Sequence, residues 1–204
     1  IFLTHCHLDH IASLPPFLDA VYDGSGNCVT IHGNAHVLEI LRNDVFNNRI
    51  YPDFLKISTF RPPYLKLNEV KAGEVISVEG LRVKPVEVDH VVPTLGYVIE
   101  DERSQVVFAA DSGPTQAIWD VANGSSKPTT VFMECTFPDS LLWLADIAKH
   151  LTPSTFAGEM AKVKMGSRFI TVHIHPRQRA TVTAELQAKA PSAEIGQFAT
   201  VYDL

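Results

Sequence analysis

At 204 residues the chain is long enough to bury the core of one domain, and its length alone does not require two. A hydrophobic content of 46% with a charged content of 20% excludes a disordered or collagen-like chain. The net charge of −6 excludes a broad electrostatic attraction to nucleic acid or anionic membranes, so an anionic substrate would have to be attracted locally.

The cysteine content and the hydropathy of the chain limit the class of protein further. The three cysteines are few and odd in number, so they indicate no disulfide framework. No apolar run reaches the roughly 18 residues of a membrane-spanning helix, and we expect no membrane partner. Because the sequence starts on an apolar segment without an initiator Met, its cellular location stays open, with the cytoplasm slightly favoured over the periplasm or secretion.

Apolar runs and turn residues predict the following elements in chain order. A helix begins at residues 11–14 and is closed early by Pro15 and Pro16, and residues 49–63 form a loop region. Asn34 is expected to cap a helix whose apolar stripe continues to Val45. Further helices are predicted at 141–148, 154–163 and 177–190, and strands at 1–4, 29–32, 75–78, 81–88, 95–99, 106–110, 130–133, 169–172 and within 195–202.

The order of these elements indicates the fold class. Strands dominate the first half, and strands alternate with helices in the second half, which is typical of an α/β domain with helices outside the sheets. The continuously apolar runs at 106–110 and 130–133 predict strands that are buried on both faces. We therefore expect a single layered α/β domain over residues 1–204.

The segment Thr4-His5-Cys6-His7-Leu8-Asp9-His10 carries the strongest chemical signal in the chain. Three imidazoles spaced H-x-H-x-x-H, with a carboxylate before the last, follow directly on a predicted strand. Neutral imidazole nitrogen and carboxylate oxygen are the donors that Zn²⁺ and similar divalent ions prefer. A polar loop that is rich in histidine by chance would rarely show this spacing, so the segment predicts a metal site.

Several other predicted strands also end in a residue that can bind a metal or transfer a proton. In α/β proteins, ligands bind in the crevice at the carboxyl ends of the strands. Singly, each such residue has an ordinary explanation, because an Asp is often a turn residue and a His is often part of the core. Together they supply the ligands of a second metal; the residues are Asp89, His90, Asp111, Glu134 and His173.

A charge count indicates the substrate class of such a site. Asp111 is short and acidic, so it suits a position that bridges two cations, and a hydroxide can bridge opposite it. Two divalent ions carry four positive charges, and Asp9, Asp111 and the hydroxide cancel three. The remaining charge suits a phosphodiester, since paired metals stabilise both the attacking and the leaving oxygen.

The opening motif His5-Cys6-His7-Leu8-Asp9-His10 resembles the defining motif of the metallo-β-lactamase fold hydrolases. Extended to Leu14, it is similar to the signature of the class II cyclic-nucleotide phosphodiesterases. Three further stretches resemble that class: Asn48-Arg49-Ile50-Tyr51-Pro52-Asp53-Phe54, Met133-Glu134-Cys135-Thr136-Phe137 and Lys149-His150-Leu151-Thr152-Pro153. The resemblance implies an αββα sandwich with the site at one edge. It also implies strands upstream of the motif that this sequence does not contain, so we expect a domain that lacks its N-terminal strands.

The resemblance also implies which residues bind the metals. Asp111 would bridge the two ions, while the first metal would be held by His5, His7 and His90, and the second by Asp9, His10 and His173. His173 is preferred because Val172-His173-Ile174 and the following His175-Pro176 resemble the His-Ile-Lys-Pro of the family. His175 stays an alternative, since on a strand it would face the same side as His173.

Two residues are predicted to act in catalysis, Asp9 and His150. In the family and in its relative ribonuclease Z, a His in the context of His150 lies near the scissile phosphate, where it contacts phosphoryl oxygens or protonates the leaving oxygen. The alternative is a histidine that interacts with the dipole at a helix C-terminus. Glu134 is expected either to orient such a His or to be solvated at a strand end. Cys6, His32 and His36 are interpreted as packed, structural or surface residues.

These features predict a phosphodiesterase that hydrolyses 3′,5′-cyclic nucleotides, cyclic AMP first, through a hydroxide that bridges two metal ions, zinc by preference. The partner is then a small cyclic nucleotide rather than a long nucleic acid, and a homodimer is compatible with it. The alternatives are a ribonuclease Z-like nuclease, a glyoxalase or lactonase, and a non-catalytic scaffold on the same fold. The sequence offers no run of Lys and Arg to grip RNA, which disfavours the nuclease, and no predicted ligand is missing, which disfavours the scaffold.

Overall fold

The computed structural model describes residues 1–203, which form two compact units. We call residues 1–71 the N-terminal unit and the residues from 72 onward the C-terminal unit, and each has a hydrophobic core of its own. The single domain expected from the sequence stays a prediction.

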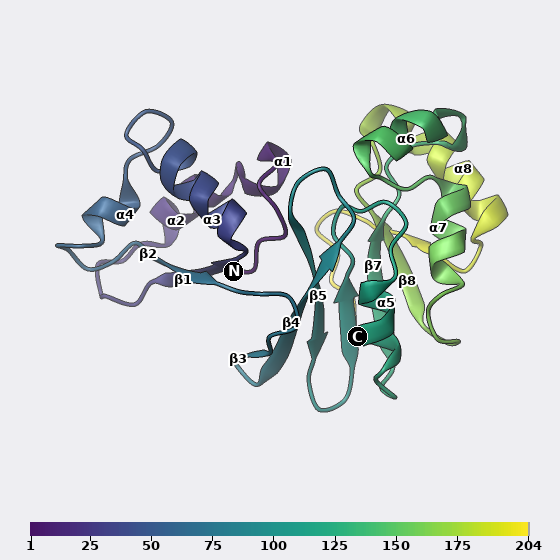
Figure 1. Cartoon of the computed structure of the whole chain (residues 1–204), viewed down its shortest axis with the longest axis horizontal. Helices are drawn as coiled ribbons and strands as arrows, with labels where there is room; N and C mark the ends of the chain where they lie inside the picture. Colours follow the sequence, from purple (N-terminus) through teal and green to yellow (C-terminus); the bar gives the residue numbers. More distant parts are fainter. Residues whose placement is uncertain (204) are drawn as a thin grey trace. The chain divides into compact units, whose positions relative to one another are not determined.

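The N-terminal unit packs short helices on a two-stranded parallel sheet (Figure 1). Its core contains Leu18, Ile31 and Leu41, each with no exposed surface. Asn34 caps the third helix as predicted, because its side-chain oxygen accepts a hydrogen bond from the backbone amide of Val37 at 2.9 Å. The elements are α1 (Leu8–Ile11), α2 (Leu14–Val21), β1 (Val29–Gly33), α3 (Ala35–Ile40), the π-helix η1 (Leu41–Val45), α4 (Phe54–Ile57) and β2 (Leu65–Glu69).

Two predictions for this unit were wrong. Pro15 and Pro16 do not close a helix but lie in the first turn of α2, where backbone N–H groups have no intrahelical acceptor and proline is tolerated. The predicted strand at residues 1–4 is only an isolated bridge between Phe2 and His32. Two elements of this unit were not predicted: strand β2, which pairs in parallel with β1, and the short helix α4 within the predicted loop.

The C-terminal unit is built on one seven-stranded sheet in the order β3-β4-β5-β6-β7-β8-β9. Strands β3 to β6 pair antiparallel, and β6 to β9 pair parallel through helical crossovers. The strands are β3 (Ile76–Val78), β4 (Leu81–Val88), β5 (Thr94–Glu100), β6 (Gln105–Phe108), β7 (Thr129–Glu134), β8 (Arg168–Val172) and β9 (Glu194–Ile195). The helices are α5 (Ala117–Asn123), the 3-10 turn η2 (Asp139–Leu141), α6 (Leu142–Ala148), α7 (Pro153–Met160), the 3-10 turn η3 (Pro176–Gln178) and α8 (Arg179–Lys189).

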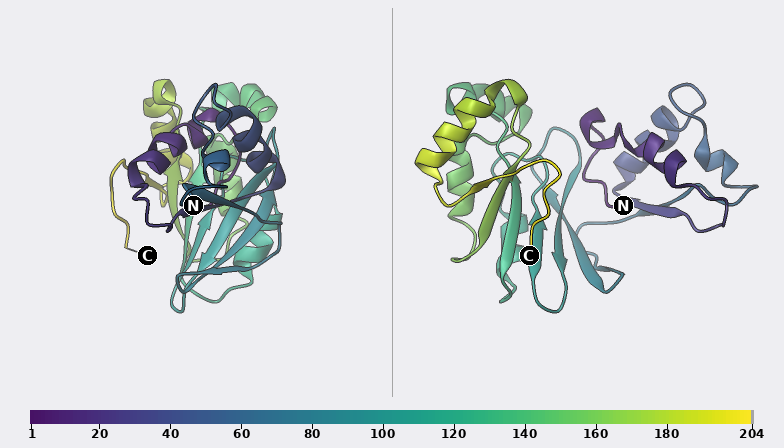
Figure 2. Two further views of the ribbon diagram at one scale, coloured as in Figure 1. Left: turned by 90° about the vertical axis from the view of Figure 1, so that its left-hand side faces the viewer. Right: turned by 180° about the vertical axis from the view of Figure 1, so that it is seen from behind.

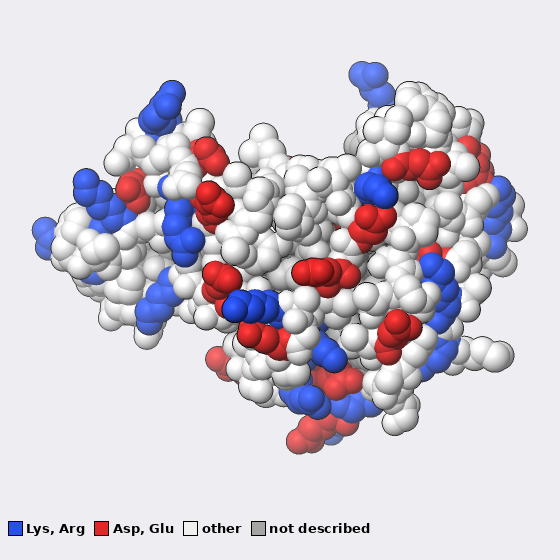
Figure 3. Space-filling view, in the orientation of Figure 1, with Lys and Arg blue, Asp and Glu red and all other residues white. Residues whose placement is uncertain are grey.

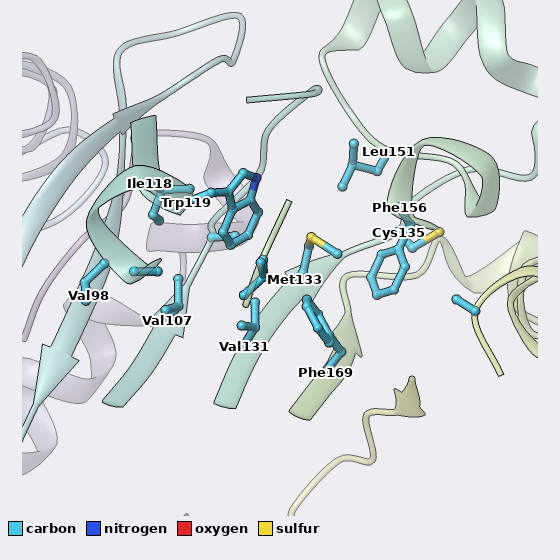
Figure 4. Packing of buried hydrophobic residues seen from close by; sticks show 14 of the residues in the cluster. Val98, Val107, Ile118, Trp119, Val131, Met133, Cys135, Leu151, Phe156 and Phe169 are labelled. Carbon is cyan, nitrogen blue, oxygen red and sulfur yellow. The ribbon is translucent and has the colours of Figure 1, made fainter. Parts of the chain in front are cut away.

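The core of this unit lies between the sheet and the helices on one of its faces. Val107 and Val131 on the strands have no exposed surface, and they share a cluster with Trp119 of α5 and Phe156 of α7 (Figure 4). The described residues that follow β9, up to residue 203, cross the opposite face of the sheet (Figure 2), where the ring of Tyr202 lies 5.8 Å from that of Phe132. Burial of this many apolar side chains is the main term that stabilises the unit.

The prediction that residues 106–110 form a strand buried on both faces was wrong, whereas residues 130–133 are buried on both faces apart from Phe132. In β6 burial alternates, so that Val107 is buried while Phe108 is 41% exposed, and Phe132 of β7 is likewise partly exposed. The alternation follows from the pleat of a strand whose helices cover one face. The predicted strand within residues 195–202 is limited to the two residues of β9, and α5 was not predicted.

Candidate functional site

Four strands of the C-terminal unit run in the same direction and end at the same edge of its sheet. Since β4 and β6 are each antiparallel to β5, they are parallel to one another, and β7 and β8 continue this direction. The residues predicted as ligands or proton carriers follow these ends; they are His90 after β4, Asp111 after β6, Glu134 at the end of β7 and His173 after β8. The topology therefore gathers them as the sequence predicts.

These side chains form one compact cluster together with His150. The ligand atoms of His90, Asp111 and His150 lie within 4.8 Å of one another, and so do those of Glu134, His150 and His173. The imidazole rings of His150 and His173 are stacked, with centroids 5.5 Å apart, and the ring of His90 meets that of His150 edge-on at 5.2 Å. A set of imidazole nitrogens and carboxylate oxygens at this spacing fits a divalent metal such as zinc.

The backbone is strained at three points of the cluster. Ala110, Lys149 and His173 have φ angles of 58°, 57° and 55°, the left-handed region that non-glycine residues rarely adopt. Ala110 directly precedes Asp111, Lys149 directly precedes His150, and His173 is itself a predicted ligand. Lys149 ends α6, where a left-handed residue is common. At Ala110 and His173, which end no helix, such conformations cost about 1 kcal/mol or more each, and they collect at functional sites.

A buried carboxylate holds His150 in place. Glu134 is 1% exposed, and its Oε1 lies 2.6 Å from Nδ1 of His150, a distance typical of a charge-assisted hydrogen bond. The same carboxylate accepts hydrogen bonds from the backbone amides of Ser112, Thr136 and Leu151, at 3.0–3.3 Å. Glu134 is thus not solvated at a strand end, and it orients His150.

His90 and His173 also have defined partners. Nδ1 of His90 lies 3.1 Å from the carbonyl oxygen of Lys149, whose ammonium in turn pairs with Asp89 at 2.9 Å. Because a carbonyl only accepts, His90 donates from Nδ1 and keeps Nε2 for a metal. Nε2 of His173 lies 3.3 Å from Oδ2 of Asp111.

The structure distinguishes His173 from His175. Strand β8 ends at Val172, so neither histidine lies on a strand and the alternation that would place them on one face does not apply. His173 reaches Asp111, whereas the ring of His175 stacks against Phe137 with centroids 6.0 Å apart. We therefore keep His173 as the proposed ligand.

The N-terminal unit assembles the histidines of the opening motif. His7 occupies the position directly before α1, which carries Asp9 and His10 in its single turn. His5 is fully buried, and its Nε2 lies 3.0 Å from Nδ1 of His7, while its ring centroid lies 4.1 Å from that of His10. Nε2 of His10 lies 3.7 Å from the carboxylate of Asp9. The motif thus collects its ligands within one unit, and a joint centre with the residues of the C-terminal unit stays a prediction.

The remaining histidine and cysteine interpretations agree with the contacts. His32 stacks on Phe2 at 4.4 Å and lies 2.9 Å from the amide of Asn68, and burial lowers its pKa. Desolvation raises the pKa of the thiols of Cys6 and Cys135, which disfavours the reactive thiolate. None of these residues belongs to the candidate ligand groups that the described residues form.

Two contributors to the site were missed by the sequence analysis. One is the hydroxyl of Thr136, which lies between Glu134 and His173, and the other is the backbone carbonyl of Lys149. Thr136 stands in a quoted motif and could have been suspected, whereas a backbone carbonyl leaves no trace in a sequence. Among residues 1–203, no helix has the length and hydrophobicity that a membrane crossing requires.

Comparison with known proteins places this site in a family. Residues 1–174 match the model of the beta-lactamase superfamily domain. Ribonuclease Z of Mycobacterium bovis BCG Pasteur is 28% identical over 134 residues, which are 61% of this chain and 48% of that protein. Ribonuclease Z of Ignicoccus hospitalis is 26% identical over 168 residues, which are 80% of this chain and 48% of that protein. The chain thus spans about half the length of these curated relatives.

Solved structures share the fold. The crystal structure of unliganded yeast PDE1 has a TM-score of 0.81 at 22% identity, and the match covers 96% of this chain and 66% of that one. Human tRNase Z, short form, has a TM-score of 0.66 at 17% identity, with 97% of this chain and 75% of that one covered. The metallo-β-lactamase fold expected from the sequence is confirmed, and it implies divalent metal ions. Because the family model covers most of its length, the chain belongs to the superfamily of metallo-β-lactamase fold hydrolases.

Proposed function

We propose that this chain belongs to a phosphodiesterase that hydrolyses 3′,5′-cyclic nucleotides, with cyclic AMP as the first substrate, to 5′-nucleotides. The observation that carries the proposal is the pair of His150 and buried Glu134 beside the ligand cluster, because a phosphodiester needs a proton for its leaving oxygen. The resemblance of four segments to class II cyclic-nucleotide phosphodiesterases and the similarity to yeast PDE1 support the same substrate class.

The proposed site uses both units and two divalent ions, zinc by preference. His5, His7, Asp9 and His10 would contribute from the N-terminal unit, and His90, Asp111 and His173 from the C-terminal unit. Bound metals would supply Lewis-acid stabilisation of the phosphoryl oxygens and a nucleophile at neutral pH.

His150 is the proposed general acid. Its Nδ1 faces the carboxylate of Glu134, which stabilises the positive charge of an imidazolium, so the proton on Nε2 is available for the 3′-oxygen as it leaves. Five hydrogen-bond donors converge on this carboxylate, including the hydroxyl of Thr136 at 2.8 Å, and they hold the dyad in a fixed geometry. The fixed geometry is what an acid catalyst requires.

A second candidate function is a ribonuclease Z-like nuclease, which the curated relatives favour. Binding of a long RNA needs a positively charged surface, and a net charge of −6 provides no broad positive potential. On the face of the C-terminal unit shown in Figure 3, Lys and Arg side chains are interspersed with Asp and Glu rather than gathered in one patch. We therefore rank the cyclic nucleotide first. A scaffold role ranks last, because the predicted ligand positions are all filled by residues that can bind metal.

The proposal is tested by purifying the protein and measuring its metal content beside its turnover of cyclic AMP, cyclic GMP, a thioester and precursor tRNA. We expect bound divalent metal and hydrolysis of cyclic AMP to the 5′-nucleotide. Bound metal with cleavage of precursor tRNA alone would select the nuclease, and turnover of the thioester alone would select a glyoxalase-type hydrolase. Bound metal without any turnover would favour the scaffold.

A further inference from the structure

The hydroxyl of Thr136 lies at the centre of the cluster in the C-terminal unit. Thr136 is 4% exposed, and its Oγ1 lies 2.8 Å from Oε2 of Glu134 and 2.9 Å from Nδ1 of His173. The same oxygen lies 3.1 Å from the carbonyl oxygen of His173 and 3.3 Å from Nδ1 of His150. Four polar atoms thus compete for a group that has one proton to donate.

Charge and distance decide where that proton goes. Both oxygen neighbours can only accept, and the carboxylate of Glu134 is the nearer of the two and the one with a negative charge. The hydroxyl therefore donates to Glu134, and its lone pairs are left to accept. Nδ1 of His173, at 2.9 Å, is then the donor of the bond that joins it to Thr136.

We propose that Thr136 is a positioning residue that makes Nε2, and not Nδ1, the metal-binding atom of His173. Glu134 thereby sets the tautomers of two histidines, that of His150 directly and that of His173 through the hydroxyl. This inference rests on the metal role of His173 in the proposed function.

The geometry at the far side of the His173 ring agrees with this assignment. Nε2 lies 3.3 Å from Oδ2 of Asp111. When the proton is on Nδ1, Nε2 of His173 and Oδ2 of Asp111 both direct lone pairs at one another. Two ligand atoms that bind the same cation have this arrangement. His90 offers the same pattern, because its Nδ1 faces the carbonyl oxygen of Lys149 at 3.1 Å.

A competing arrangement has the hydroxyl donating to Nδ1 of His173, with Nε2–H donating to Asp111. It would take the Thr136 proton away from the buried carboxylate of Glu134 and turn a ligand nitrogen into a donor. The two arrangements differ in which ring nitrogen of His173 binds the metal and in whether the hydroxyl matters for metal affinity. Both differences can be measured without turnover.

The experiment compares three variants of the full chain with the wild type. Thr136→Val removes the hydroxyl at nearly constant shape, and Thr136→Ser keeps it. Thr171→Val is the matched control, because the hydroxyl of this neighbouring β8 residue is buried and has no hydrogen-bond partner among the described residues. Zinc affinity is measured by competition with a chromophoric chelator, and the ring nitrogens of His173 are identified by ¹⁵N NMR of the zinc-loaded chain.

We expect Thr136→Val to lose roughly 10–100-fold in zinc affinity, as outer-shell partners of metal ligands do. Thr136→Ser and Thr171→Val should stay close to wild type. In the wild type, Nε2 should carry the metal and Nδ1 a slowly exchanging proton near the Thr136 side chain, and this proton should exchange rapidly in Thr136→Val.

Three results would overturn the inference: zinc affinity unchanged by Thr136→Val, an equal loss in Thr136→Ser, or metal on Nδ1 of wild-type His173. The last measurement needs no variant, so it decides the matter even if Thr136→Val does not fold. Zinc bound as expected by a chain that does not hydrolyse cyclic AMP would reject the proposed function and leave the role of Thr136 intact.

Discussion

In the N-terminal unit the candidate ligands His5, His7, Asp9 and His10 occupy one short segment, whereas in the C-terminal unit they are spread over strand ends between residues 90 and 173. The contacts that hold them differ as well. The ring of His5 is held by the hydroxyl of Thr4 at 3.0 Å and by its neighbouring histidines.

Thr4 is the chain neighbour of His5, whereas in the C-terminal unit each histidine predicted as ligand or acid has, on Nδ1, an oxygen partner that lies at least 16 positions away in the chain. These partners are the carbonyl of Lys149 for His90, the carboxylate of Glu134 for His150 and the hydroxyl of Thr136 for His173. The difference teaches that a local motif can specify ligands, while topology has to specify both the ligands and the groups that orient them. We therefore expect the C-terminal unit to be the more preorganised partner of a joint metal centre.

The largest effect should come from removing one predicted ligand in each unit. If both sets serve one centre, Asp111→Asn and His7→Ala should each lower metal affinity by more than the roughly 10–100-fold typical of an outer-shell loss, and turnover should fall to background. Metal content and turnover are measured together, with Asp120→Asn on the exposed side of α5 as control.

Two outcomes would contradict the expectation that the ligands of both units serve one metal centre. Full metal content and rate in His7→Ala would limit the centre to the C-terminal unit, and the same result in Asp111→Asn would reject the bridging role.

A smaller effect is expected from His150→Ala, which removes the proposed acid. Turnover should fall by roughly 10²–10⁴-fold while metal content stays unchanged, because a positioned proton donor contributes about that much to a rate. His36→Ala, in the N-terminal unit and outside the candidate ligand groups, is the control. A variant that is less stable but turns over normally would show that His150 only interacts with the end of α6, and a variant without metal would make it a ligand.

The two cores provide the next test. Phe156 of α7 and Leu18 of α2 have no exposed surface, so Phe156→Ala should cost about 3–5 kcal/mol and Leu18→Ala about 2–5 kcal/mol of stability. Because each core is built within its own unit, hydrogen exchange should accelerate mainly in the unit that carries the substitution. Equal acceleration in both units would instead support the single cooperative domain predicted from the sequence.

The same contrast explains what could be predicted from the sequence. The opening motif was identified because its ligands are neighbours in the chain, and the strand-end residues were identified because parallel strands end at one edge. The predicted fold is confirmed. The assignment of individual site residues stays a prediction, although the C-terminal unit does gather His90, Asp111, His150 and His173.

The misses have physical causes. Pro15 and Pro16 were interpreted as helix breakers, although proline is also favoured in the first turn of a helix. Only the surrounding packing decides whether the prolines end one helix or begin another. The exposure of Phe108 could not be seen in an apolar run, because the run does not show which face the helices cover. The roles of the Lys149 carbonyl and of the Thr136 hydroxyl depend on tertiary contacts, which a sequence does not show.

The smallest expected effect concerns a carboxylate that ties η2 to α7 and α8. Asp139 accepts hydrogen bonds from the amide and hydroxyl of Ser154, each at 2.9 Å, and from the ammonium of Lys189. Partial burial alone would raise the pKa of Asp139, but the bonds from Lys189, Ser154 and Thr152 outweigh it and lower the pKa to about 2.

A depressed pKa fixes the sign of the pH dependence. The stabilisation from Asp139 is complete above its unfolded pKa of about 4 and is lost as the pH falls through about 2. Asp139→Asn should therefore cost about 1 kcal/mol at neutral pH, after allowance for solvent screening, and progressively less as the pH falls through about 2. Asp23→Asn in the N-terminal unit is the comparison, since this carboxylate is exposed and its main partner is the neighbouring Ser25. Denaturant unfolding between about pH 1 and pH 7 measures both variants; a penalty for Asp139→Asn that is the same at about pH 1 as at neutral pH would mean that packing rather than the charge of Asp139 holds the three elements together.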